Sequence, residues 1–401
     1  MLQPDPNDHG MCARNVGTER EPPGRCSTRV RAGTDWCTLA LVAQRTWFAA
    51  VMLATCSIGC GSGARSLDGG GADAASNVSP DTGVSGDDGA GGDDTVFTWS
   101  QGAPCPQPRF EANGAVIDGE LWVMGGFTAS TLQVTRAIEI YDPATDTWRP
   151  GPDLPGAETH IGVATVGRDI IVVGGFSGTF SNGPRPPDIA DVWRWSAADG
   201  AWNPGPPLPS ARAAFACGLV GNLLHVAGGL GPDGASDAPE HFVWDITAAP
   251  SSATWVTAAP LLDARNHGGG AAVGGSFYAV AGRHQWNELS GDVPDLNQFD
   301  PASGNWIDLA PIPTPRSEIG ASTTAMSDGR LLVIGGSTAG VTPNSDVLVY
   351  DPAQDTWTAL PSLPQRRKGA VAARIGRSII VTTGSPTSVD PSATTFVGCC
   401  F

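Results

Sequence analysis

The sequence predicts an all-β protein in which six four-stranded sheets stand around a common axis, a six-bladed β-propeller. The first observation is an apolar run that ends in Gly-Gly or a near variant. It recurs six times at intervals of 48–54 residues, ending at Gly126, Gly175, Gly229, Gly282, Gly336 and Gly384. The second is a tryptophan with the same period, at Trp99, Trp148, Trp202, Trp255, Trp306 and Trp357. Periods of about 20–50 residues are typical of solenoids and propellers.

Each repeat contains β-rich segments separated by Gly, Pro and Asp turns, and the chain has 53 Gly and 34 Pro in 401 residues. A single four-stranded sheet cannot bury both of its faces, so neighbouring sheets must stack. We expect the tryptophans to fill the space between blades and the paired glycines to let backbones approach closely. Three similar phrases, at 141–148, 299–306 and 350–357, contain Asp-Pro. We expect Asp142, Asp300 and Asp351 to fix turns rather than to act as catalytic acids.

The two ends of the repeat region indicate how the ring closes. The region opens with a lone tryptophan strand, residues 96–99, and ends with a unit, residues 367–401, that has no tryptophan strand of its own. We therefore expect the first strand to complete the last sheet of a propeller that spans residues 95–401.

A third marker is an arginine ten residues after most of the tryptophans, at Arg109, Arg212, Arg265, Arg316 and Arg367. With the Gly-Gly runs and the Tyr-Asp phrases, it makes residues 95–401 resemble the kelch repeat, in a protein of the bacterial secreted or lipoprotein type. The resemblance implies a kelch propeller. It implies no particular activity, because propellers host many functions.

Residues 1–60 are expected to be a targeting segment. The apolar run 47–58 follows Arg45 and is shorter than the roughly 20 residues that span a bilayer, but it has the length of a signal-peptide core. It ends at two lipobox-like sequences, at Cys56 and Cys60, and Gly59 favours lipidation of Cys60. An ordinary secretory signal is the alternative. Residues 61–94 are rich in Gly, Ala, Ser and Asp and predict a disordered linker.

The formal net charge of −17 argues against nucleic acid as a partner, because binding to a phosphate backbone depends on Lys and Arg. The layout predicts an exported protein of the cell envelope or extracellular space that touches a membrane only through a lipid anchor. No paired C-x-x-C spacing for zinc is present, and we expect no metal, no cofactor and a monomer.

A ligand site is expected at the mouth formed by the loops that join the fourth strand to the first and the second strand to the third. Positions ten and twelve after each tryptophan should share a face if the segment is a regular strand. The first set of loops then supplies Glu158, His160, Arg212, Arg265, His267, Arg316, Glu318 and Arg367, with Glu111 at position twelve of the first repeat. The second set supplies Arg283, His284 and Trp286.

Such a ring could focus an anionic ligand. Alternatively, each arginine pairs with backbone or a neighbouring acid as part of the repeat. Glu158, in the place of an arginine, is either a functional exception or a relief of repulsion.

Cys105 takes a position that is Leu or Ile in the other repeats, next to the predicted ring closure. A disulfide from Cys105 to Cys399 or Cys400 is possible in an oxidising compartment. The alternative is that Cys105 only packs in the core.

Two classes of function remain. The first is a binding or interaction propeller that holds a protein or carbohydrate at its mouth. The second is a carbohydrate-acting enzyme that resembles the bacterial N-acetylneuraminate epimerase, also a kelch propeller. In that reading Glu158, His160, His267 and Glu318 supply acid–base groups and Arg212 or Arg265 binds the sugar carboxylate.

Overall fold

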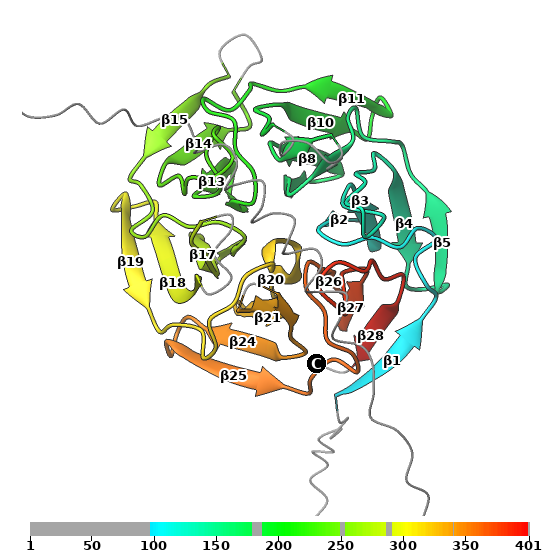
Figure 1. The fold of residues 1–401 in the computed structure, drawn as a ribbon. Helices are drawn as coiled ribbons and strands as arrows, with labels where there is room; N and C mark the ends of the chain where they lie inside the picture. The colour runs from blue at the N-terminus through cyan, green and yellow to red at the C-terminus, as the bar shows by residue number, and fades with distance from the viewer. Residues whose placement is uncertain (1–96, 179–186, 249–252, 286–290, 340, 400–401) are drawn as a thin grey trace, which may run out of the picture. The chain divides into compact units, whose positions relative to one another are not determined.

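The computed structural model of the chain describes residues 97–178, 187–248, 253–285, 291–339 and 341–399. The predicted targeting segment, the lipidation site and the linker lie outside these ranges. The described residues form six four-stranded antiparallel sheets that stand around one axis as blades (Figure 1). The six-bladed all-β propeller predicted from the repeats is confirmed.

The strands of each blade follow one another as a meander, apart from the last blade, which takes its outer strand from the start of the described chain. Blade 1 consists of β2 (Asn113–Ile117), β3 (Glu120–Met124), β4 (Ile138–Asp142) and β5 (Thr147–Pro150). Blade 2 consists of β7 (Gly162–Val166), β8 (Asp169–Val173), β10 (Val192–Ser196) and β11 (Ala201–Pro204). Blade 3 consists of β12 (Ala216–Val220), β13 (Leu223–Ala227), β14 (His241–Asp245) and β15 (Trp255–Ala258).

Blade 4 consists of β16 (Gly269–Val273), β17 (Ser276–Arg283), β18 (Asp292–Asp300) and β19 (Asn305–Leu309). Blade 5 consists of β20 (Thr323–Ala325), β21 (Leu331–Ile334), β24 (Val347–Asp351) and β25 (Thr356–Leu360), preceded by a 3-10 turn, Gly320–Ser322. Blade 6 consists of β26 (Val371–Ile375), β27 (Ser378–Thr382), β28 (Thr395–Cys399) and β1 (Thr98–Gly102). Two small sheets pair β6 (Glu158–Thr159) with β9 (Phe176–Ser177) and β22 (Ser337–Thr338) with β23 (Thr342–Pro343).

The first strands of neighbouring blades contact one another around the axis, and the fourth strands form the outer edge (Figure 1). In blade 6 the outer strand is β1, which pairs antiparallel with β28 and places Trp99 opposite Gly398. The pairing continues beyond the strand, because the Cys105 amide donates to the Ala393 carbonyl at 2.7 Å. The two ends of the described chain are thus held in the same blade.

In five of the six blades, all but blade 2, the tryptophan of the fourth strand connects the blade to the one before it. The indole Nε1 of Trp148 donates to the Ala103 carbonyl at 2.9 Å, and that of Trp357 donates to the Ala310 carbonyl at 2.8 Å. Trp99, Trp255 and Trp306 make the same kind of bond. The expectation that these side chains fill the space between blades is confirmed.

The Tyr-Asp phrases also have structural roles. The hydroxyl of Tyr350 donates to Asp355 at 2.6 Å, and the same carboxylate oxygen accepts the Ala310 amide of the preceding blade at 2.8 Å. Asp142, Asp300 and Asp351 each accept a hydrogen bond from the amide two residues further along. The prediction that these three aspartates fix turns is confirmed.

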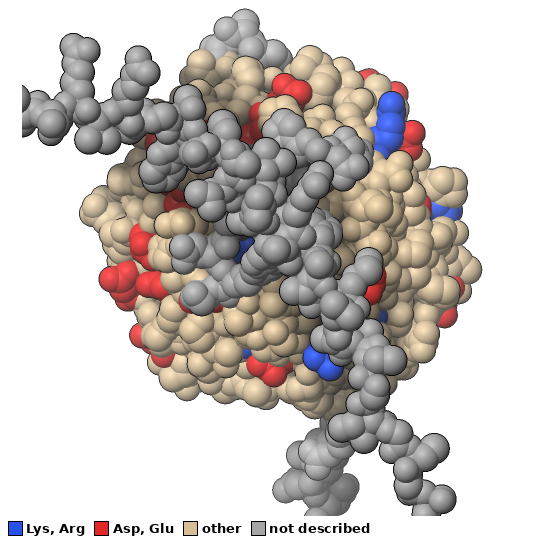
Figure 2. All heavy atoms as spheres, in the orientation of Figure 1, with Lys and Arg blue, Asp and Glu red and all other residues tan. Residues whose placement is uncertain are grey.

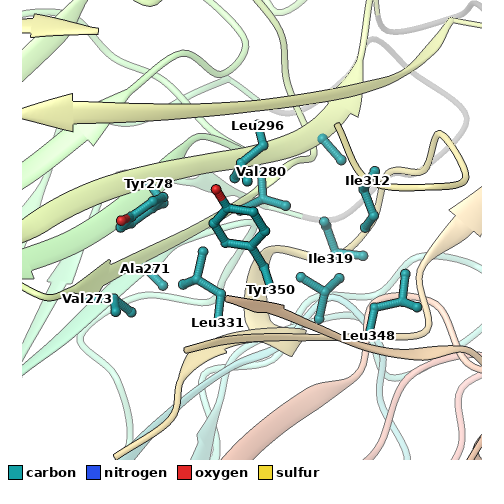
Figure 3. Close-up of a cluster of buried hydrophobic side chains, with 12 residues drawn as sticks. Ala271, Val273, Tyr278, Val280, Leu296, Ile312, Ile319, Leu331, Leu348 and Tyr350 are labelled. Carbon is teal, nitrogen blue, oxygen red and sulfur yellow. The ribbon is translucent and has the colours of Figure 1, made fainter. Parts of the chain in front are cut away.

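The hydrophobic core lies between the blades rather than inside them. Figure 3 shows the cluster between blades 4 and 5, in which Tyr278 and Val280 of β17 face Leu331 of β21 and Tyr350 of β24. Among the described residues, each of the six pairs of neighbouring blades has such a cluster. Burial between sheets is therefore what holds the blades in a ring.

The Gly-Gly pairs lie where a blade meets the loop that enters the next one. Gly335 has a φ of 63°, and a Cβ atom there would lie 2.4 Å from the Arg367 carbonyl oxygen. Both the conformation and the space therefore require glycine. On the face drawn in Figure 2, acidic side chains are scattered around the rim and basic ones occur at fewer places. In the described part of the chain no helix has the length and apolar character to cross a membrane.

Candidate ligand-binding site at the inner ring

Six equivalent residues enter the channel just before the first strand of each blade, and we call them the inner ring. They are the residues at position twelve: Glu111, His160, Ala214, His267, Glu318 and Gly369. Every one has a positive φ, between 53° and 58°. Such angles are uncommon outside glycine, and here the same left-handed residue occurs in every blade.

The inner ring is held by bonds that run from blade to blade. The Ala214 amide donates to the His160 carbonyl at 3.1 Å, and the His267 amide donates to the Ala214 carbonyl at 2.8 Å. Glu111 bonds in the same way to Gly369, and Gly369 to Glu318. The position of each inner-ring side chain is thus fixed by the backbone of its neighbours.

Four of the inner-ring residues carry ionisable side chains, and these meet. His160 Nε2 lies 2.8 Å from Glu111 Oε2. Arg283, at the end of β17, places Nη1 3.0 Å from Glu318 Oε1 and Nη2 3.1 Å from His267 Nε2. The imidazole rings of His160 and His267 are in edge contact, with centroids 4.9 Å apart.

Hydrogen bonds define the tautomer of His267. Its Nδ1 bonds the Asn266 side-chain oxygen, which is an acceptor, so Nδ1 carries the proton. Its Nε2 then accepts from the Arg283 guanidinium. Burial and the nearby Arg283 hold the pKa of His267 well below its usual range. The ring is therefore neutral at physiological pH.

The two carboxyl groups of the inner ring, those of Glu111 and Glu318, differ in charge. Burial and the neighbouring Glu318 carboxylate raise the pKa of Glu111, which favours its protonated form. Burial acts on Glu318 in the same direction, but the nearby cations Lys368 and Arg283 outweigh it and hold its pKa well below the usual range. One protonated and one ionised carboxyl thus lie beside two imidazoles and a guanidinium.

Glu111, His160, His267 and Glu318 line the end of a cavity of about 440 Å³ in the central channel, and Arg283 lies behind His267 and Glu318. Its walls are made by the inner ring and by small residues of the first strands, among them Gly114, Gly162, Gly218 and Ala271. The cavity is large enough for a side chain or a monosaccharide-sized ligand. The arrangement offers hydrogen-bond donors, acceptors and proton-transfer groups at one place.

The same residues are the ones that could hold a metal. Ligand atoms of His160, His267 and Glu318 lie within 4.8 Å of one another, and two histidines with a carboxylate are a donor set for a transition metal. Arg283, however, already bonds His267 Nε2 and Glu318. A metal would have to displace this cation, so the donor set fits an organic ligand better.

The position-ten arginines do not line this cavity, and the expectation that they face the channel was wrong. Arg212, Arg265, Arg316 and Arg367 are all at most 3% exposed, as is Arg109. Arg212 Nη1 donates to the Gly228 carbonyl at 3.0 Å, and Arg316 Nη1 donates to the Gly335 carbonyl at 3.0 Å. The physical reason is the left-handed residue at position twelve, which breaks the alternation of a regular strand.

Glu158 is likewise buried, at 3% exposure, and lies outside the cavity wall. Burial and the nearby Asp191 raise its pKa to about 8. It occupies the position of the blade arginine and is not one of the groups that meet at the inner ring. Its assignment as an acid–base group beside His160 was therefore wrong.

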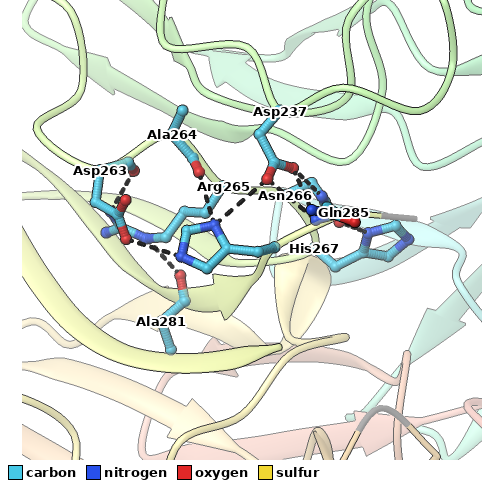
Figure 4. Close-up of polar contacts among 9 residues, drawn as sticks. Asp237, Asp263, Ala264, Arg265, Asn266, His267, Ala281 and Gln285 are labelled. Atoms are coloured by element: carbon cyan, nitrogen blue, oxygen red, sulfur yellow. Dashed lines mark hydrogen bonds and ion pairs between the residues drawn. The ribbon is translucent and has the colours of Figure 1, made fainter. Parts of the chain in front are cut away.

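The loop after β17 contributes differently from expectation (Figure 4). His284 does not face the cavity; its ring bonds Asp237 at 3.3 Å and Asp263 at 3.2 Å. Asp237 also accepts from the Asn266 side chain, and Asn266 bonds His267. His284 thus belongs to a chain of contacts that orients His267 from behind. Trp286 lies outside the described residues.

Two residues of the site were missed. Glu111 was recognised at position twelve but not included among the candidates, although it contacts His160 directly. Lys368, the one lysine of the sequence, is buried at position eleven and influences both His267 and Glu318. Its uniqueness among 22 arginines was a signal that could have been used.

The cysteines of the described chain are not paired. Cys105 and Cys399 are both free thiols, so the predicted disulfide is absent from the structure. Cys105 is buried and its sulfur bonds the Gln107 carbonyl at 3.3 Å, which fits the alternative that it packs in the core. Cys400 and Cys60 lie outside the described residues.

Comparison with known proteins agrees with the geometry. The fold and the channel define a six-bladed β-propeller. Residues 108–155, 159–209 and 321–364 match the Kelch motif. The chain thus carries kelch repeats within a six-bladed β-propeller.

Three relatives show how far the similarity extends. The chain is 26% identical over 262 residues to Kelch-like protein terF of Aspergillus terreus, covering 64% of this chain and 56% of that protein. It is 31% identical to human Kelch-like protein 34 over 59% of this chain and 36% of the relative. It is 27% identical to mouse Kelch-like protein 40 over 52% of this chain and 32% of that relative. The chain thus spans between 32% and 56% of the length of these relatives, which are fungal and animal proteins. They lend no support to the expected bacterial secreted type.

Proposed function

We propose that the protein is an interaction propeller that binds a partner protein through the inner-ring end of its channel. The observation that carries the proposal is the meeting of Glu111, His160, His267 and Glu318 at the end of a 440 Å³ cavity, with Arg283 bonded to His267 and Glu318. Kelch propellers generally bind protein partners, which favours a protein over a free small molecule. In this proposal a side chain or a loop tip of the partner enters the cavity and bonds these groups.

The test compares the wild-type protein with Arg283→Ala and His267→Ala as baits for extracellular and envelope proteins. We expect specific partners to be retained by the wild type and lost at least about tenfold with both variants, because buried polar contacts dominate such sites. Arg374→Ala, on the cavity wall away from the inner ring, is the control and should keep the partners. A partner set that is identical for all four proteins would reject the inner ring as the site.

A sugar-acting enzyme is the second candidate, and one observation favours it. A neutral His267, a protonated Glu111 and an ionised Glu318 are the kinds of group that general acid–base catalysis uses. Arg283 replaces Arg212 or Arg265 as the cation for a sugar carboxylate. Anomer-resolved NMR with N-acetylneuraminic acid tests this function. Unchanged mutarotation in the presence of the protein would discard it.

The location remains part of the proposal. A short apolar run before Cys60 and the polar stretch 61–94 support export, with Cys60 as a lipid anchor. Metabolic labelling with palmitate tests the anchor. We expect a labelled band that disappears in Cys60→Ala, and a band that persists in this variant would exclude Cys60.

A further inference from the structure

Each blade has one fixed place for a buried positive charge. In blades 1, 3 and 5 the arginine at position ten donates from its guanidinium to the carbonyl of the first glycine of the Gly-Gly pair, as Arg109 does to Gly125 at 3.1 Å and Arg212 to Gly228 at 3.0 Å. The residue just before the third strand borders the same place, because its carbonyl accepts the amide of that glycine in blades 3 and 5.

In blades 3 and 5 this bordering residue is acidic and pairs with the arginine. Arg212 bonds Glu240 at 3.1 Å, and Arg316 bonds Asp346 at 3.0 Å. In blade 4 the equivalent residue is Asp295, whose charge acts on Arg265. The place thus combines a carbonyl oxygen, a carboxylate and a cation.

Blade 2 keeps the oxygens and lacks the cation. Gly174 is the first glycine of its pair, and its amide donates to the Asp191 carbonyl at 2.8 Å, as in blades 3 and 5. The arginine, however, is replaced by Glu158. Two acidic residues close enough for the charge of Asp191 to act on Glu158 therefore stand where blades 3 and 5 have an ion pair.

The Glu158 carboxylate is not satisfied by the protein. The residue is 3% exposed, and its Oε2 has no hydrogen-bond partner. A buried carboxylate oxygen without a donor is costly, and in a folded protein it calls for a ligand or a proton. Asp191, in contrast, is exposed, which leaves a path to solvent.

We propose that blade 2 binds a calcium ion in the place of the missing guanidinium. Its ligands are the carboxylates of Glu158 and Asp191 and the Gly174 carbonyl oxygen, with water completing the shell on the exposed side. All of these donors are oxygen atoms, and two carboxylates with a carbonyl are typical of calcium sites. The ion then supplies in blade 2 the buried positive charge that arginine supplies in the other blades. The site is separate from the inner ring, so it is independent of the proposed function.

The test uses the full-length protein at pH 7.5 with the calcium chelated or added back. We expect added Ca²⁺ to raise the melting temperature of the wild type, and Glu158→Gln and Asp191→Asn to lose most of this shift. Asp346→Asn, which removes the equivalent carboxylate from a blade that has its arginine, should keep the shift.

Glu158→Arg gives the sharpest variant, because it restores the residue found in the other blades. We expect its melting temperature without calcium to be close to that of the calcium-loaded wild type. Added Ca²⁺ should not change this temperature. Luminescence of bound Tb³⁺ provides a readout besides stability, since Trp193 lies two residues from Asp191 and can sensitise it. The emission should appear with the wild type, be displaced by Ca²⁺ and vanish in Glu158→Arg.

Two results would overturn the site. One is a melting temperature that is the same with and without Ca²⁺. The other is equal Tb³⁺ emission from the wild type and Glu158→Arg. A third pattern would assign a proton, not a metal, to Glu158. In that pattern Ca²⁺ leaves the melting temperature of the wild type unchanged, and the wild type loses stability as the pH rises from 7 to 9. Glu158→Gln shows no such loss.

Discussion

The blade arginine acts as a clamp between two segments of backbone. Arg316 is fully buried, and it connects the Thr314 carbonyl, the Gly335 carbonyl and the Asp346 carboxylate. A planar guanidinium can serve several acceptors at fixed angles, which a lysine cannot do. This explains why arginine recurs at position ten although it contributes nothing to the cavity wall.

Arg316→Ala should lower the free energy of unfolding by about 2–4 kcal/mol, because it leaves buried carbonyl oxygens without a donor. Arg316→Lys should recover only part of this loss. Urea denaturation measures both. Arg330→Ala, which breaks an exposed pair with Asp328, is the control and should cost no more than about 1 kcal/mol. Equal effects at the two positions would contradict the clamp.

Single residues also show where the sequence was sufficient for prediction and where it was not. The period located the arginines and the inner ring, because both recur with the tryptophans. The period could not predict the direction in which these side chains point, because position twelve adopts a left-handed conformation in residues as different as Glu111, His160 and Ala214. The residue types at this position do not predict that conformation. It is imposed by the backbone hydrogen bonds that join inner-ring residues of neighbouring blades.

Blades are coupled through shared hydrogen bonds as well as through apolar contact. The Asp355 carboxylate receives Tyr350 from its own blade and the Ala310 amide from the preceding blade. The Asp146 carboxylate does the same for Tyr141 and Ala103. One side chain in a turn therefore fixes the spacing of two blades.

Asp355→Ala should destabilise the protein by about 1–3 kcal/mol, since it leaves a buried tyrosine hydroxyl and an amide without an acceptor. Chemical denaturation measures this loss. Asp351→Ala, in the same turn but bonded only within it, should cost less. An equal loss in the two variants would mean that the contact between blades contributes little.

Blades 3 and 4 enclose a pair of buried histidines that makes stability depend on pH. His225 Nδ1 and His241 Nε2 are 2.9 Å apart, and the rings pack against Phe277 and Phe299. Burial lowers the pKa of His225 to about 4 and, together with His225, that of His241 to about 3. Both are neutral in the folded state.

The unfolded chain takes up these protons near pH 6.5, before the folded chain does. The stabilisation is therefore present above pH 6.5 and is lost as the pH falls towards the lowered values. At pH 5 we expect a loss of up to about 2 kcal/mol for each histidine. Denaturation at pH 7.5 and pH 5 measures it, and a double replacement of both residues by Phe should flatten the dependence. A wild-type stability that is the same at both pH values would contradict buried, neutral rings.

The whole molecule depends on closure of the ring. Six interblade clusters supply the core, and each blade is covered on both sides only if blade 6 meets blade 1. The repeats made the number of blades predictable, because each carries its own markers. The site at the inner ring was only partly predictable. Arg283 was expected from the loops between the second and third strands, but Lys368 lies at position eleven, outside the series that supplied the other candidates.

The most direct test of the account is removal of β1, residues 98–102, from the full chain. This strand completes blade 6 and carries Trp99, whose indole bonds blade 5 at Pro361. Thermal unfolding followed by circular dichroism is the measurement. A closed ring predicts that the shortened chain loses its cooperative transition or melts more than about 10 °C below the parent. A transition of unchanged midpoint and sharpness would show that the blades do not depend on closure.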